Sequence, residues 1–552
     1  MFEGYDYEEL KRRANTRLSE SIVAKLEARG ERRSIAAGER LYEVDDRGYP
    51  LAYAATATLE VRGGDGMKLG VMEPGQFTGE LGLLLGQTSF SECAALEAGE
   101  IVVVGPRALT ELIQIDPEVS DCLLPALAAR RLLLMERQEG ALILVGEEGA
   151  PRLQRISAYA ERNRIPWRWL DPADPAHAEE ICACDAGGAG AKVVVHGRHV
   201  LTDPTVAEVA RALGLELDIG DGQPVDLVIA GAGPAGLSAA VYGASEGLRT
   251  VIVDDVSIGG QSGASSRIEN FLGFPTGVSG ADLAFAAELQ AVKFGARLGV
   301  PRSARRLAPG DETHAITLED GSVLRARAVV LATGARYRKL GLADEDRFES
   351  AGLYYAATEL EARACQGKDV VVVGGGNSAG QAAMFLSGRA ASVRLVCRGR
   401  ALSQTMSDYL VGRLERAPNV TIEMRAQVVE LLGEERLAAV HISGGDGQTA
   451  EHAVGGIFVM IGADPCTGWL QDVVRLDSRG FVLTGPDCGV TDHQPGSQFQ
   501  TSVPGVFAVG DVRSGSVKRV ASAVGEGSVV VQAIHARLAA LRQAEGREPV
   551  TL

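Results

Sequence analysis

The sequence predicts an α/β protein in which a strand-rich block and a small α/β block precede a large, glycine-rich block. Three observations lead to this prediction. The 552 residues are enough for about three to four domains of common size. Short β-like runs separated by glycine-containing turns fill the first block, as in small β-structures. Two strand–glycine–helix units, beginning at Gly231 and Gly374, recur in the last block, as in folds with parallel sheets.

Charge and composition exclude several classes of protein. The chain has 55 lysines and arginines against 72 aspartates and glutamates, a formal net charge of −17, whereas nucleic-acid binding and polybasic membrane attachment need basic surfaces. No apolar run approaches the roughly 18 residues of a membrane span, and the polar start MFEGYDYEELKRR is unlike a signal peptide. Eight scattered cysteines do not make a disulfide scaffold. We therefore expect a cytoplasmic protein with reduced thiols that binds neither nucleic acid nor membrane.

Residues 1–140 are predicted to form a small β-roll followed by a helix. A helical stretch at 7–30 comes first, and the β-like runs RLYEV, ATLEV, KLGVM and EIVVV follow between glycine turns. An apolar-rich pattern with near-helical spacing at 119–137 closes the block before Gly140.

Residues 141–220 are predicted to form a small α/β domain. ALILVG, PWRWLD and KVVVHG have the apolar character of buried strands. Helical patterns cover 151–164 and 205–213. The size and the order of these elements fit one βαβ-like module.

The first glycine unit reads DLVIAGAGPAGLSAAVYGA, with the spacing GxGxxG at Gly231, Gly233 and Gly236. It follows an apolar strand and opens a helix of small residues, and the next strand ends in Asp254. In such a unit the first glycine permits a tight turn, the second lets the backbone approach a pyrophosphate, and the third lets helix and strand pack closely. The helix N-terminus attracts the anion, and Asp254 can accept the ribose hydroxyls. The pattern predicts a dinucleotide site.

The second unit reads DVVVVGGGNSAGQAAMFLS, with GxGxxA at Gly374, Gly376 and Ala379. The strand after it ends in Cys-Arg-Gly-Arg, so Arg398 and Arg400 stand where the first unit has a carboxylate. Guanidinium groups at this place favour a 2′-phosphate, and hence NADPH over NADH. Two dinucleotide sites in one chain imply a flavin and a nicotinamide, with hydride transfer from NAD(P)H to the flavin.

Residues 225–552 resemble the low-molecular-weight thioredoxin reductases, flavoproteins of the pyridine nucleotide–disulfide oxidoreductase superfamily. The matching segments are GAGPAGLSAA, GGQ, IENFLGFP, ATGA, GGGNSA, FVMIGADPCTGWL and TSVPGVFAVGDVRSG. The resemblance implies the thioredoxin reductase fold with two Rossmann-like domains. FAD-binding segments at 221–340 and 464–552 would enclose an NAD(P)H-binding domain at 341–463. The resemblance also implies a homodimer.

The same resemblance assigns cofactor contacts residue by residue. FAD would be bound by Gly231, Gly233, Pro234, Ala235, Gly236, Asp254, Gly260, Gln261, Asn270, Thr333, Gly334, Gly510, Asp511, Arg519, Val520 and Ala521. NADPH would be bound by Gly374, Gly376, Asn377, Ser378, Ala379, Arg398 and Arg400. Within the first set, Asp511 would bond the ribityl chain, and Gly260, Gln261, Asn270 and 519–521 would line the isoalloxazine.

The chain departs from this family at the redox dithiol. The family has Cys-Ala-Thr-Cys just before the second glycine unit, and this sequence has Ala356 and Glu359 at the two cysteine positions. Storage of two electrons in a disulfide needs two adjacent thiols, so the sequence does not identify the catalytic residues. The family's His-Arg-Arg cluster is also altered, to Cys397, Arg398 and Gly399, which leaves NADH as the alternative to NADPH.

Residues 1–140 resemble cyclic-nucleotide-binding domains, on the line MEPGQFTGELGLLLGQ with Gly79-Glu80-Leu81. In that family the glutamate takes the ribose 2′-hydroxyl, and an arginine farther along pairs with the cyclic phosphate. The corresponding stretch GQTSFSECA has no arginine, and a phosphate without a guanidinium loses its strongest partner. We therefore expect a structural or dimerising β-roll rather than a receptor for cyclic nucleotides.

Residues 141–220 resemble a thioredoxin or glutaredoxin fold, whose CxxC would follow ALILVG. The loop GEEGAPRL at that place has no cysteine. Cys182 and Cys184, in EEICACDAG, are the only thiols of the block. They are either a relocated dithiol that accepts electrons or two incidental cysteines in a loop. The histidines and cysteines show no metal-binding spacing, so no metal is expected.

The sequence thus predicts an FAD-dependent oxidoreductase that takes hydride from NAD(P)H, and three hypotheses describe where the electrons go. The first passes them to a disulfide, through Cys182 and Cys184 or a thioredoxin-like partner. The second passes them directly to a ferredoxin, a flavodoxin, a quinone, a dye or dioxygen, and the absence of a CxxC beside the flavin favours it. In the third, the flavin senses the NAD(P)H pool and the N-terminal domains relay its state.

Overall fold

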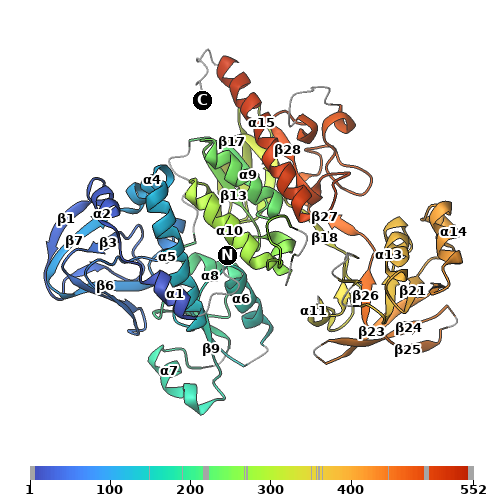
Figure 1. The fold of residues 1–552 in the computed structure, drawn as a ribbon, viewed down its shortest axis with the longest axis horizontal. Coiled ribbons are helices and arrows are strands. Elements are labelled where there is room, and N and C mark those ends of the chain that lie inside the picture. Colours follow the sequence, from blue (N-terminus) through green and yellow to red (C-terminus); the bar gives the residue numbers. More distant parts are fainter. Residues whose placement is uncertain are drawn as a thin grey trace. The chain divides into compact units, whose positions relative to one another are not determined.

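The computed structural model of the chain describes residues 7–147, 150–188, 190–215, 223–265, 268, 271–349, 351–355, 357, 361–362, 365–434, 436–445, 447–489 and 497–544. Its internal contacts divide the chain into two compact units (Figure 1). Unit 1 consists of residues 1–264, 278–334 and 467–552, and unit 2 of residues 265–277 and 335–466. Among the described residues, no helix combines the length and the apolar character needed to cross a membrane.

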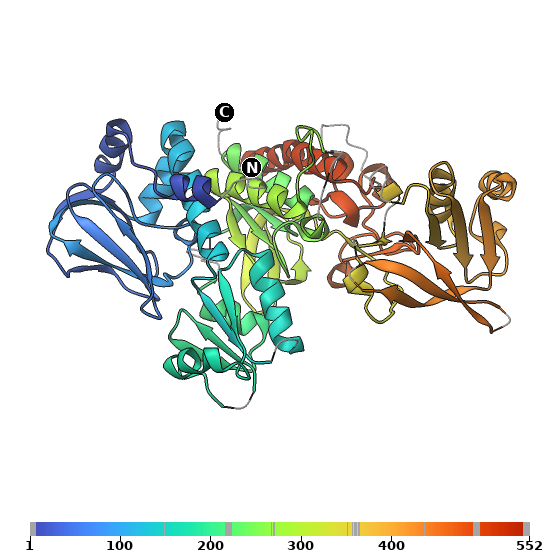
Figure 2. The same cartoon turned by 60° about the horizontal axis from the view of Figure 1, so that its bottom comes forward.

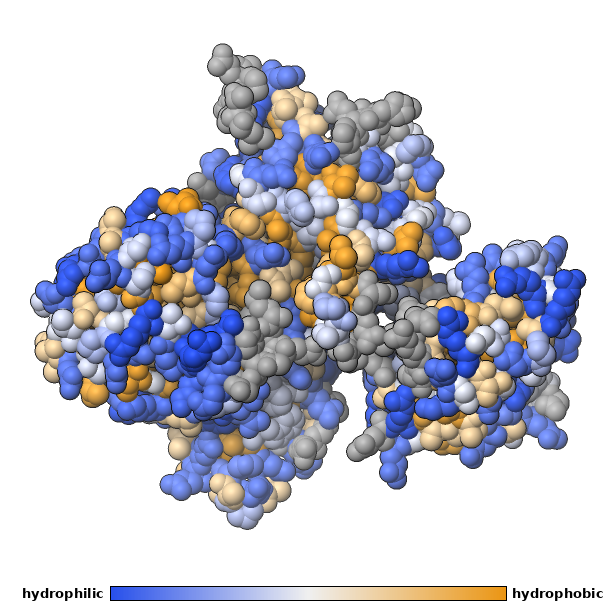
Figure 3. Space-filling model, in the orientation of Figure 1, coloured by the Kyte–Doolittle hydropathy of each residue, from blue (hydrophilic) through white to orange (hydrophobic). Residues whose placement is uncertain are grey.

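The first part of unit 1 is a β-roll with helices at both ends. Its antiparallel strands form two sheets, in the orders β1-β7-β3 and β2-β6-β4-β5, around one apolar core. The elements are α1 (Tyr7–Ala14), α2 (Glu20–Glu27), β1 (Glu31–Ile35), β2 (Arg40–Tyr42), β3 (Leu51–Ala54), β4 (Thr58–Gly63), β5 (Lys68–Met72), α3 (Gly82–Leu85), β6 (Ser91–Glu97), β7 (Gly99–Val104), α4 (Pro106–Ile115) and α5 (Pro117–Glu136). Hydrophilic side chains predominate on the face of the β-roll that Figure 3 shows.

The helical stretch predicted at 7–30 is two helices rather than one. The Asn15 side chain donates to the carbonyl oxygen of Lys11 at 2.9 Å, where α1 ends. Ser19 then caps α2 by accepting from the backbone N–H of Ile22 at 3.3 Å. Asparagine and serine bond to nearby backbone groups in this way at helix ends, so they interrupt the stretch.

The second part of unit 1 is a small α/β module (Figure 2). Its strands pair in the order β11-β10-β8-β9. The elements are β8 (Leu142–Val145), α6 (Pro151–Arg162), β9 (Trp167–Leu170), α7 (Ala178–Ala183), β10 (Lys192–Val195), β11 (His199–Thr202) and α8 (Val206–Ala212). The sequence prediction missed α7 and β11. Both are short, and β11 lies at the sheet edge with half-buried and exposed residues, so it lacks the apolar run of an inner strand.

The turn between β10 and β11 packs on the β-roll. A Cβ atom at Gly64 would lie 1.8 Å from the carbonyl oxygen of His196, so only glycine fits at this contact. His196 is 2 % exposed, and its Nδ1 lies 2.7 Å from Oδ1 of Asp45. Nε2 of His199 lies 2.7 Å from Oδ2 of the same carboxylate. One carboxylate of the β-roll therefore binds two histidines of the small module.

The third part of unit 1 is a sheet with the strand order β14-β13-β12-β17-β16-β15, in which β28 also pairs with β17. Strands β12, β13, β14, β17 and β28 run parallel. The elements are β12 (Val225–Ala230), α9 (Pro234–Ser245), β13 (Thr250–Val253), η2 (Gly260–Ala264), α10 (Gly280–Lys293), β14 (Arg297–Gly299), β15 (Ala304–Ala308), β16 (His314–Leu318), β17 (Val323–Leu331), β28 (Val506–Ala508), η7 (Gly510–Val512) and α15 (Val520–Ala544). Helices α9 and α15 lie side by side (Figures 1 and 2).

Unit 2 has a parallel sheet of its own, in the order β19-β26-β20-β21-β22, and an antiparallel sheet β23-β24-β25. The larger of its two segments, residues 335–466, begins and ends with the paired strands β18 and β27. The elements are β18 (Ala335–Tyr337), α11 (Glu345–Phe348), β19 (Leu353–Tyr354), β20 (Asp369–Val373), α13 (Asn377–Ser387), β21 (Ser392–Cys397), α14 (Asp408–Arg416), β22 (Val420–Met424), β23 (Gln427–Gly433), β24 (Leu437–Ser443), β25 (Thr449–Ala453), β26 (Gly456–Val459) and β27 (Ala463–Pro465).

A buried histidine in unit 1 makes stability depend on pH. His314 on β16 is fully buried, and burial together with the charge of Arg537 lowers its pKa from 6.5 to about 4. As the pH falls between these values, the unfolded chain takes up a proton that the folded chain does not. The free energy of unfolding should therefore fall by up to about 3 kcal/mol over this range.

We expect His314→Gln to remove this part of the pH dependence, because glutamine does not titrate. Urea unfolding of both proteins at about pH 7.5 and about pH 5 measures it. If the variant lost as much stability as the unaltered protein between the two pH values, the assignment to His314 would be wrong.

Candidate functional site

The turn between β12 and α9 needs glycine at two places, Gly231 and Gly236, and leaves space beside a third, Gly233. Gly231 has φ +112°, and a Cβ atom there would lie 2.2 Å from the carbonyl oxygen of Ala332. A Cβ atom at Gly236 would lie 1.8 Å from the carbonyl oxygen of Gly231. At Gly233, the N-cap of α9, the nearest atom would be Cα of Gly260 at 4.0 Å. The turn is therefore tightly packed on one side and open at Gly233, where a pyrophosphate could approach the backbone.

Asp254 follows β13, and its carboxylate reaches back to this turn. Oδ2 accepts from the backbone N–H of Ala232 at 2.7 Å, and Oδ1 accepts from those of Val256 and Ser257 at 3.0 and 3.2 Å. Burial raises the pKa of Asp254 to about 6, whereas the three N–H donors act in the opposite direction. Because Ala232 is the only described donor to Oδ2, this oxygen can still accept a ribose hydroxyl. The carboxylate thus fits a dinucleotide at this edge.

Other residues assigned to FAD lie at the same edge of the sheet. A Cβ atom at Gly260, in η2, would lie 3.0 Å from Cα of Gly233. One at Gly510, in η7, would lie 2.9 Å from Cβ of Ala235. Thr333 and Gly334 follow β17, which pairs with β12. These segments follow the carboxyl ends of parallel strands, where open α/β sheets bind their ligands.

A half-buried polar network fixes the loop that carries Asp511. The backbone N–H of Gly510 donates to Oε2 of Glu526 at 2.7 Å, and Arg513 forms an ion pair with Oε1 of Glu526 at 2.5 Å. Burial raises the pKa of Asp511, Lys518 acts against this shift, and Glu526 adds to it. Lys518 also donates to the backbone oxygen of Asp511 at 3.2 Å. The loop is thereby held beside the start of α9.

For the remaining residues assigned to FAD, the structure gives their position and exposure. Arg519 and Ala521 are exposed at the start of α15, on either side of Val520, and Gln261 is exposed in η2. Pro234 is the first residue of α9. Asn270, Ala356 and Glu359 lie outside the described residues.

In unit 2, the turn between β20 and α13 repeats the pattern of the first turn. Gly374 has φ +144°, and a Cβ atom there would lie 2.4 Å from the carbonyl oxygen of Met460. Gly376 is the N-cap of α13, and the nearest atom to a Cβ atom there would be the carbonyl oxygen of Thr405 at 4.0 Å. Ala379 is buried in the helix, and Ser378 is exposed at its start.

A loop that the sequence prediction missed holds this second turn. The Thr405 hydroxyl donates to the carbonyl oxygen of Gly375 at 2.7 Å. The backbone N–H of Ser407 donates to Oδ1 of Asn377 at 2.8 Å. Asn377 therefore anchors the loop with its oxygen. No local sequence signal links positions 30 residues apart, so only the structure could show this contact.

The end of β21 presents arginines to solvent and conceals its cysteine. Arg398 and Arg400 are exposed directly after the strand. Cys397 is buried, its thiol donates to the carbonyl oxygen of Gly374 at 3.1 Å, and burial raises its pKa to about 11. Two guanidinium groups are thus available to a phosphate at this strand end, whereas the thiol is not.

Two tyrosines stack in unit 2 next to the altered dithiol positions. The rings of Tyr337 and Tyr355 are 5.6 Å apart and nearly parallel, at 5°. The Tyr355 hydroxyl donates to Oε1 of Glu345 at 3.1 Å, and this buried carboxylate also accepts from the backbone N–H groups of residues 340 and 341. The sequence prediction missed this aromatic pair, because stacking between distant segments has no sequence signature.

None of the eight cysteines is in a disulfide. Cys182 lies in α7 and is exposed, and Cys184 is the half-buried C-cap of the same helix. Side chains two positions apart on a helix do not face each other. Cys365 and Cys488 are buried, each with its thiol on a backbone oxygen.

Comparison with known proteins identifies two regions. The sequence profile of the pyridine nucleotide-disulphide oxidoreductase family matches residues 225–527, and that of the cyclic nucleotide-binding domain matches residues 32–116. The predicted thioredoxin reductase fold and N-terminal cyclic-nucleotide-binding-like domain are thereby confirmed. The likeness of residues 141–220 to thioredoxin stays a prediction.

Individual relatives agree with this result. The chain is 33 % identical over 329 residues to an NADH dehydrogenase of Ferdinandcohnia aciditolerans, covering 59 % of this chain and 60 % of that one. It is 34 % identical over 333 residues to a subunit of the alkyl hydroperoxide reductase of Staphylococcus aureus strain MSSA476, covering 59 % and 62 %. The chain thus spans about three fifths of the length of these relatives.

A solved structure shows the same fold. The thioredoxin reductase of Streptococcus pyogenes MGAS5005 matches with a TM-score of 0.53 and 31 % identity, over 58 % of this chain and all of that one. Flavoproteins of this type bind FAD and NAD(P)H, and the open glycine turns and Asp254 fit such dinucleotides. With more than half of its residues matched by the family profile, the chain belongs to the pyridine nucleotide-disulphide oxidoreductases.

Proposed function

We propose that the chain is an FAD-dependent oxidoreductase that oxidises NADPH and passes the electrons to an acceptor without using a thiol of its own. The placement of the thiols carries this proposal. None of the eight cysteines is in a disulfide, and none lies in the segments proposed to line the first dinucleotide site, at 231–236, 259–264, 333–334 and 510–521. A disulfide route needs two thiols that can reach each other beside the flavin.

The residues of the chain have separate roles in this proposal. Bound FAD supplies a two-electron acceptor for the nicotinamide hydride. The open backbone at Gly233 and the N-terminus of α9 take its pyrophosphate, and Asp254 takes a ribose hydroxyl. In unit 2, Gly376 and the start of α13 take the nicotinamide dinucleotide. Arg398 and Arg400 select the 2′-phosphate.

The acceptor is a ferredoxin, a flavodoxin, a quinone or another oxidant that takes electrons directly from the flavin. The relatives named above differ in the acceptors their names indicate, so family membership alone does not choose among them. Cys182 and Cys184 support a relocated dithiol poorly, because α7 separates their side chains around the helix. A homodimer and a small electron-carrier protein as partner stay part of the proposal.

Substitution of the two open glycines should affect the binding of one dinucleotide at a time. Gly233→Ala and Gly376→Ala each add one methyl group at a place with no atom nearer than 4.0 Å, so both variants should fold normally. We expect Gly233→Ala to lose FAD affinity by at least about tenfold, because the methyl group occupies the path of the pyrophosphate. Gly376→Ala should keep its flavin. Anaerobic stopped-flow mixing with NADPH should then bleach it about tenfold more slowly at subsaturating NADPH.

Flavin content and thermal unfolding of the purified variants provide the controls. Unaltered flavin content in Gly233→Ala would contradict the assignment of the first turn to FAD. A chain that carried flavin but did not bleach with NADPH or NADH would overturn the proposed oxidoreductase function.

The arginines after β21 should determine nucleotide preference. The double variant Arg398→Ala/Arg400→Ala should lower kcat/KM for NADPH by about ten- to a hundredfold, because charge-assisted phosphate contacts are lost. The value for NADH, which lacks the 2′-phosphate, should stay nearly constant. Arg413→Ala, an exposed arginine of α14 in the same unit, is the matched control. Equal losses with both nucleotides would refute the role of this arginine pair.

Removal of the thiols of Cys182 and Cys184 should leave electron transfer unchanged. We expect Cys182→Ser/Cys184→Ser to reduce ferredoxin, flavodoxin and dyes at the rate of the unaltered protein, because neither thiol takes part. Activity is measured with NADPH as donor, alongside thioredoxin with an aromatic disulfide as a second acceptor. A disulfide reductase activity that disappears in the double variant would favour the relocated dithiol instead.

A further inference from the structure

The phosphate cassette of the β-roll, residues 79–88, has its acidic residue fully engaged by the protein. Oε1 of Glu80 accepts from the backbone N–H of Gly82 at 2.7 Å and from the Tyr49 hydroxyl at 3.3 Å. Oε2 of Glu80 lies 2.8 Å from Nε and 2.6 Å from Nη2 of Arg131. Glu80 is 8 % exposed. Its acceptor sites are thus occupied, and none is left for the hydroxyls of a ligand.

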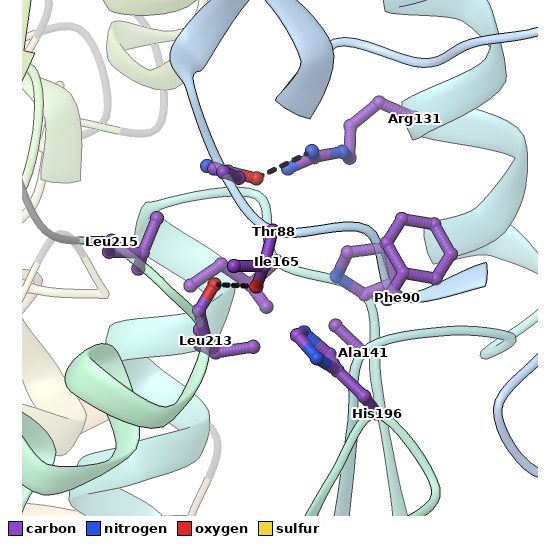
Figure 4. Close-up of a pocket in the computed structure, with 10 residues that line it drawn as sticks. Thr88, Phe90, Arg131, Ala141, Ile165, His196, Leu213 and Leu215 are labelled. Atoms are coloured by element: carbon purple, nitrogen blue, oxygen red, sulfur yellow. Dashed lines mark hydrogen bonds between the residues drawn. The ribbon is translucent and has the colours of Figure 1, made fainter. Parts of the chain in front are cut away.

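Arg131 reaches the cassette from α5 and fills the space above it. Its side chain is 2 % exposed, and Nη2 also donates to Oε1 of Gln87 at 3.0 Å (Figure 4). A Cβ atom at Gly82 would meet Oε1 of Glu80 at 2.2 Å, Oε1 of Gln87 at 2.8 Å and Nη2 of Arg131 at 3.1 Å. A methyl group at the start of α3 would therefore displace the polar groups that bind Glu80 and Arg131 to each other. The pocket beside it, lined by residues that include Arg131, Thr88 and His196, has room for about one water molecule.

The outer face of the cassette packs on the flavin-binding part of unit 1. Leu81 forms one apolar cluster with Ala128 of α5 and with Phe285 and Leu289 of α10. All four side chains are at least nine-tenths buried. The cassette is therefore a docking surface for α10.

Arg164 links the cassette to α10 by polar contacts. Its backbone oxygen accepts from Nη1 of Arg131 at 3.1 Å. Its guanidinium stacks on the Phe285 ring at 4.2 Å and donates to Oδ1 of Asp282 and to the carbonyl oxygen of Ala281, at 3.3 and 3.0 Å. Burial raises the pKa of Glu288, also on α10, to about 7, and the charges of Arg164 and Arg131 act against this shift.

Helix α10 in turn contacts the loop that carries Gly260 and Gln261. A Cβ atom at Gly259 would lie 2.7 Å from Cβ of Ala284 on α10. The next glycine, Gly260, lies against Gly233 of the first dinucleotide turn. An unbroken series of contacts thus runs from Arg131 through Arg164 and α10 to the loop at 259–261, called here the flavin-side loop.

We propose that Arg131 is the resident ligand of the β-roll: it closes the cassette from within and so fixes the surface on which α10 and the flavin-side loop are positioned. In this arrangement the β-roll braces the flavin site permanently and takes no cyclic nucleotide. Arg131 and Arg164 are positioning residues, since neither touches the first dinucleotide turn. The flavin readout below rests on the proposed function, whereas the exchange readout does not.

Hydrogen exchange of the full-length chain tests the brace. Arg164→Ala removes the link to α10 and leaves the Glu80–Arg131 pair intact, so peptides covering 279–293 should exchange at least about fivefold faster while those covering 80–88 do not change. Arg131→Met should accelerate both sets. Arg107→Ala, exposed on α4 and paired only with Glu111, is the matched control and should change neither set. If α10 exchanged at the unaltered rate in Arg164→Ala, the brace would be refuted, whether or not Arg131→Met folds.

Two further measurements complete the test. Calorimetry of the unaltered chain with cyclic AMP and cyclic GMP, up to millimolar concentrations, should show no binding. Micromolar affinity for either nucleotide would overturn the role of Arg131 as resident ligand. In the flavin-loaded protein, Arg164→Ala should shift the visible circular dichroism of the flavin, and Arg107→Ala should not. A chain that bound no flavin would fail the proposed function but would still give the exchange result.

Discussion

At the end of β12, three stretches of backbone meet with no side chains between them. Gly231 turns against Ala332 at the end of β17, and Gly236 brings α9 onto the same turn. This contact sets the position of the helix N-terminus, of Asp254 and of the loops that follow β17 and β28. The shape of the turn proposed to hold the first dinucleotide is thus a consequence of the packing that closes the sheet at this edge. Unit 2 uses the same solution at Gly374, against Met460.

The two glycine turns differ where their ligands would differ. The strand after the first turn is followed by the carboxylate of Asp254. Burial raises the pKa of this group, and backbone N–H donors act in the opposite direction. The strand after the second ends in exposed arginines and a buried thiol. A carboxylate accepts ribose hydroxyls and repels a 2′-phosphate, whereas guanidinium groups attract it. In the proposed function, the same kind of backbone turn holds both nucleotides, and the side chains at the end of the adjacent strand distinguish them.

Local sequence patterns predicted what depends on local sequence. The strand predicted as KLGVM is β5, and the helices predicted at 205–213 and 119–137 are α8 and α5 within a few residues. Both glycine turns were predicted because glycines at a fixed spacing allow the tight turn and leave the backbone open to a ligand. Contacts between distant segments were not predicted. They are the hydrogen bond from Thr405 to Gly375, the stacking of Tyr337 on Tyr355, and the ion pair of Arg131 with Glu80, 51 positions away. Arg131 lies in a predicted helix, and nothing in its neighbourhood distinguishes it from a surface arginine.

The paired strands β18 and β27 have a consequence for how such a chain could have been assembled. Ala335 lies opposite Pro465 and Tyr337 opposite Ala463, so the polypeptide leaves unit 1 and returns to it along one ribbon. Closing a loop whose ends are already adjacent has a small entropic cost, whatever the size of the insert. A nucleotide-binding lobe could therefore be gained or exchanged at this point without breaking the register of β17 and β28.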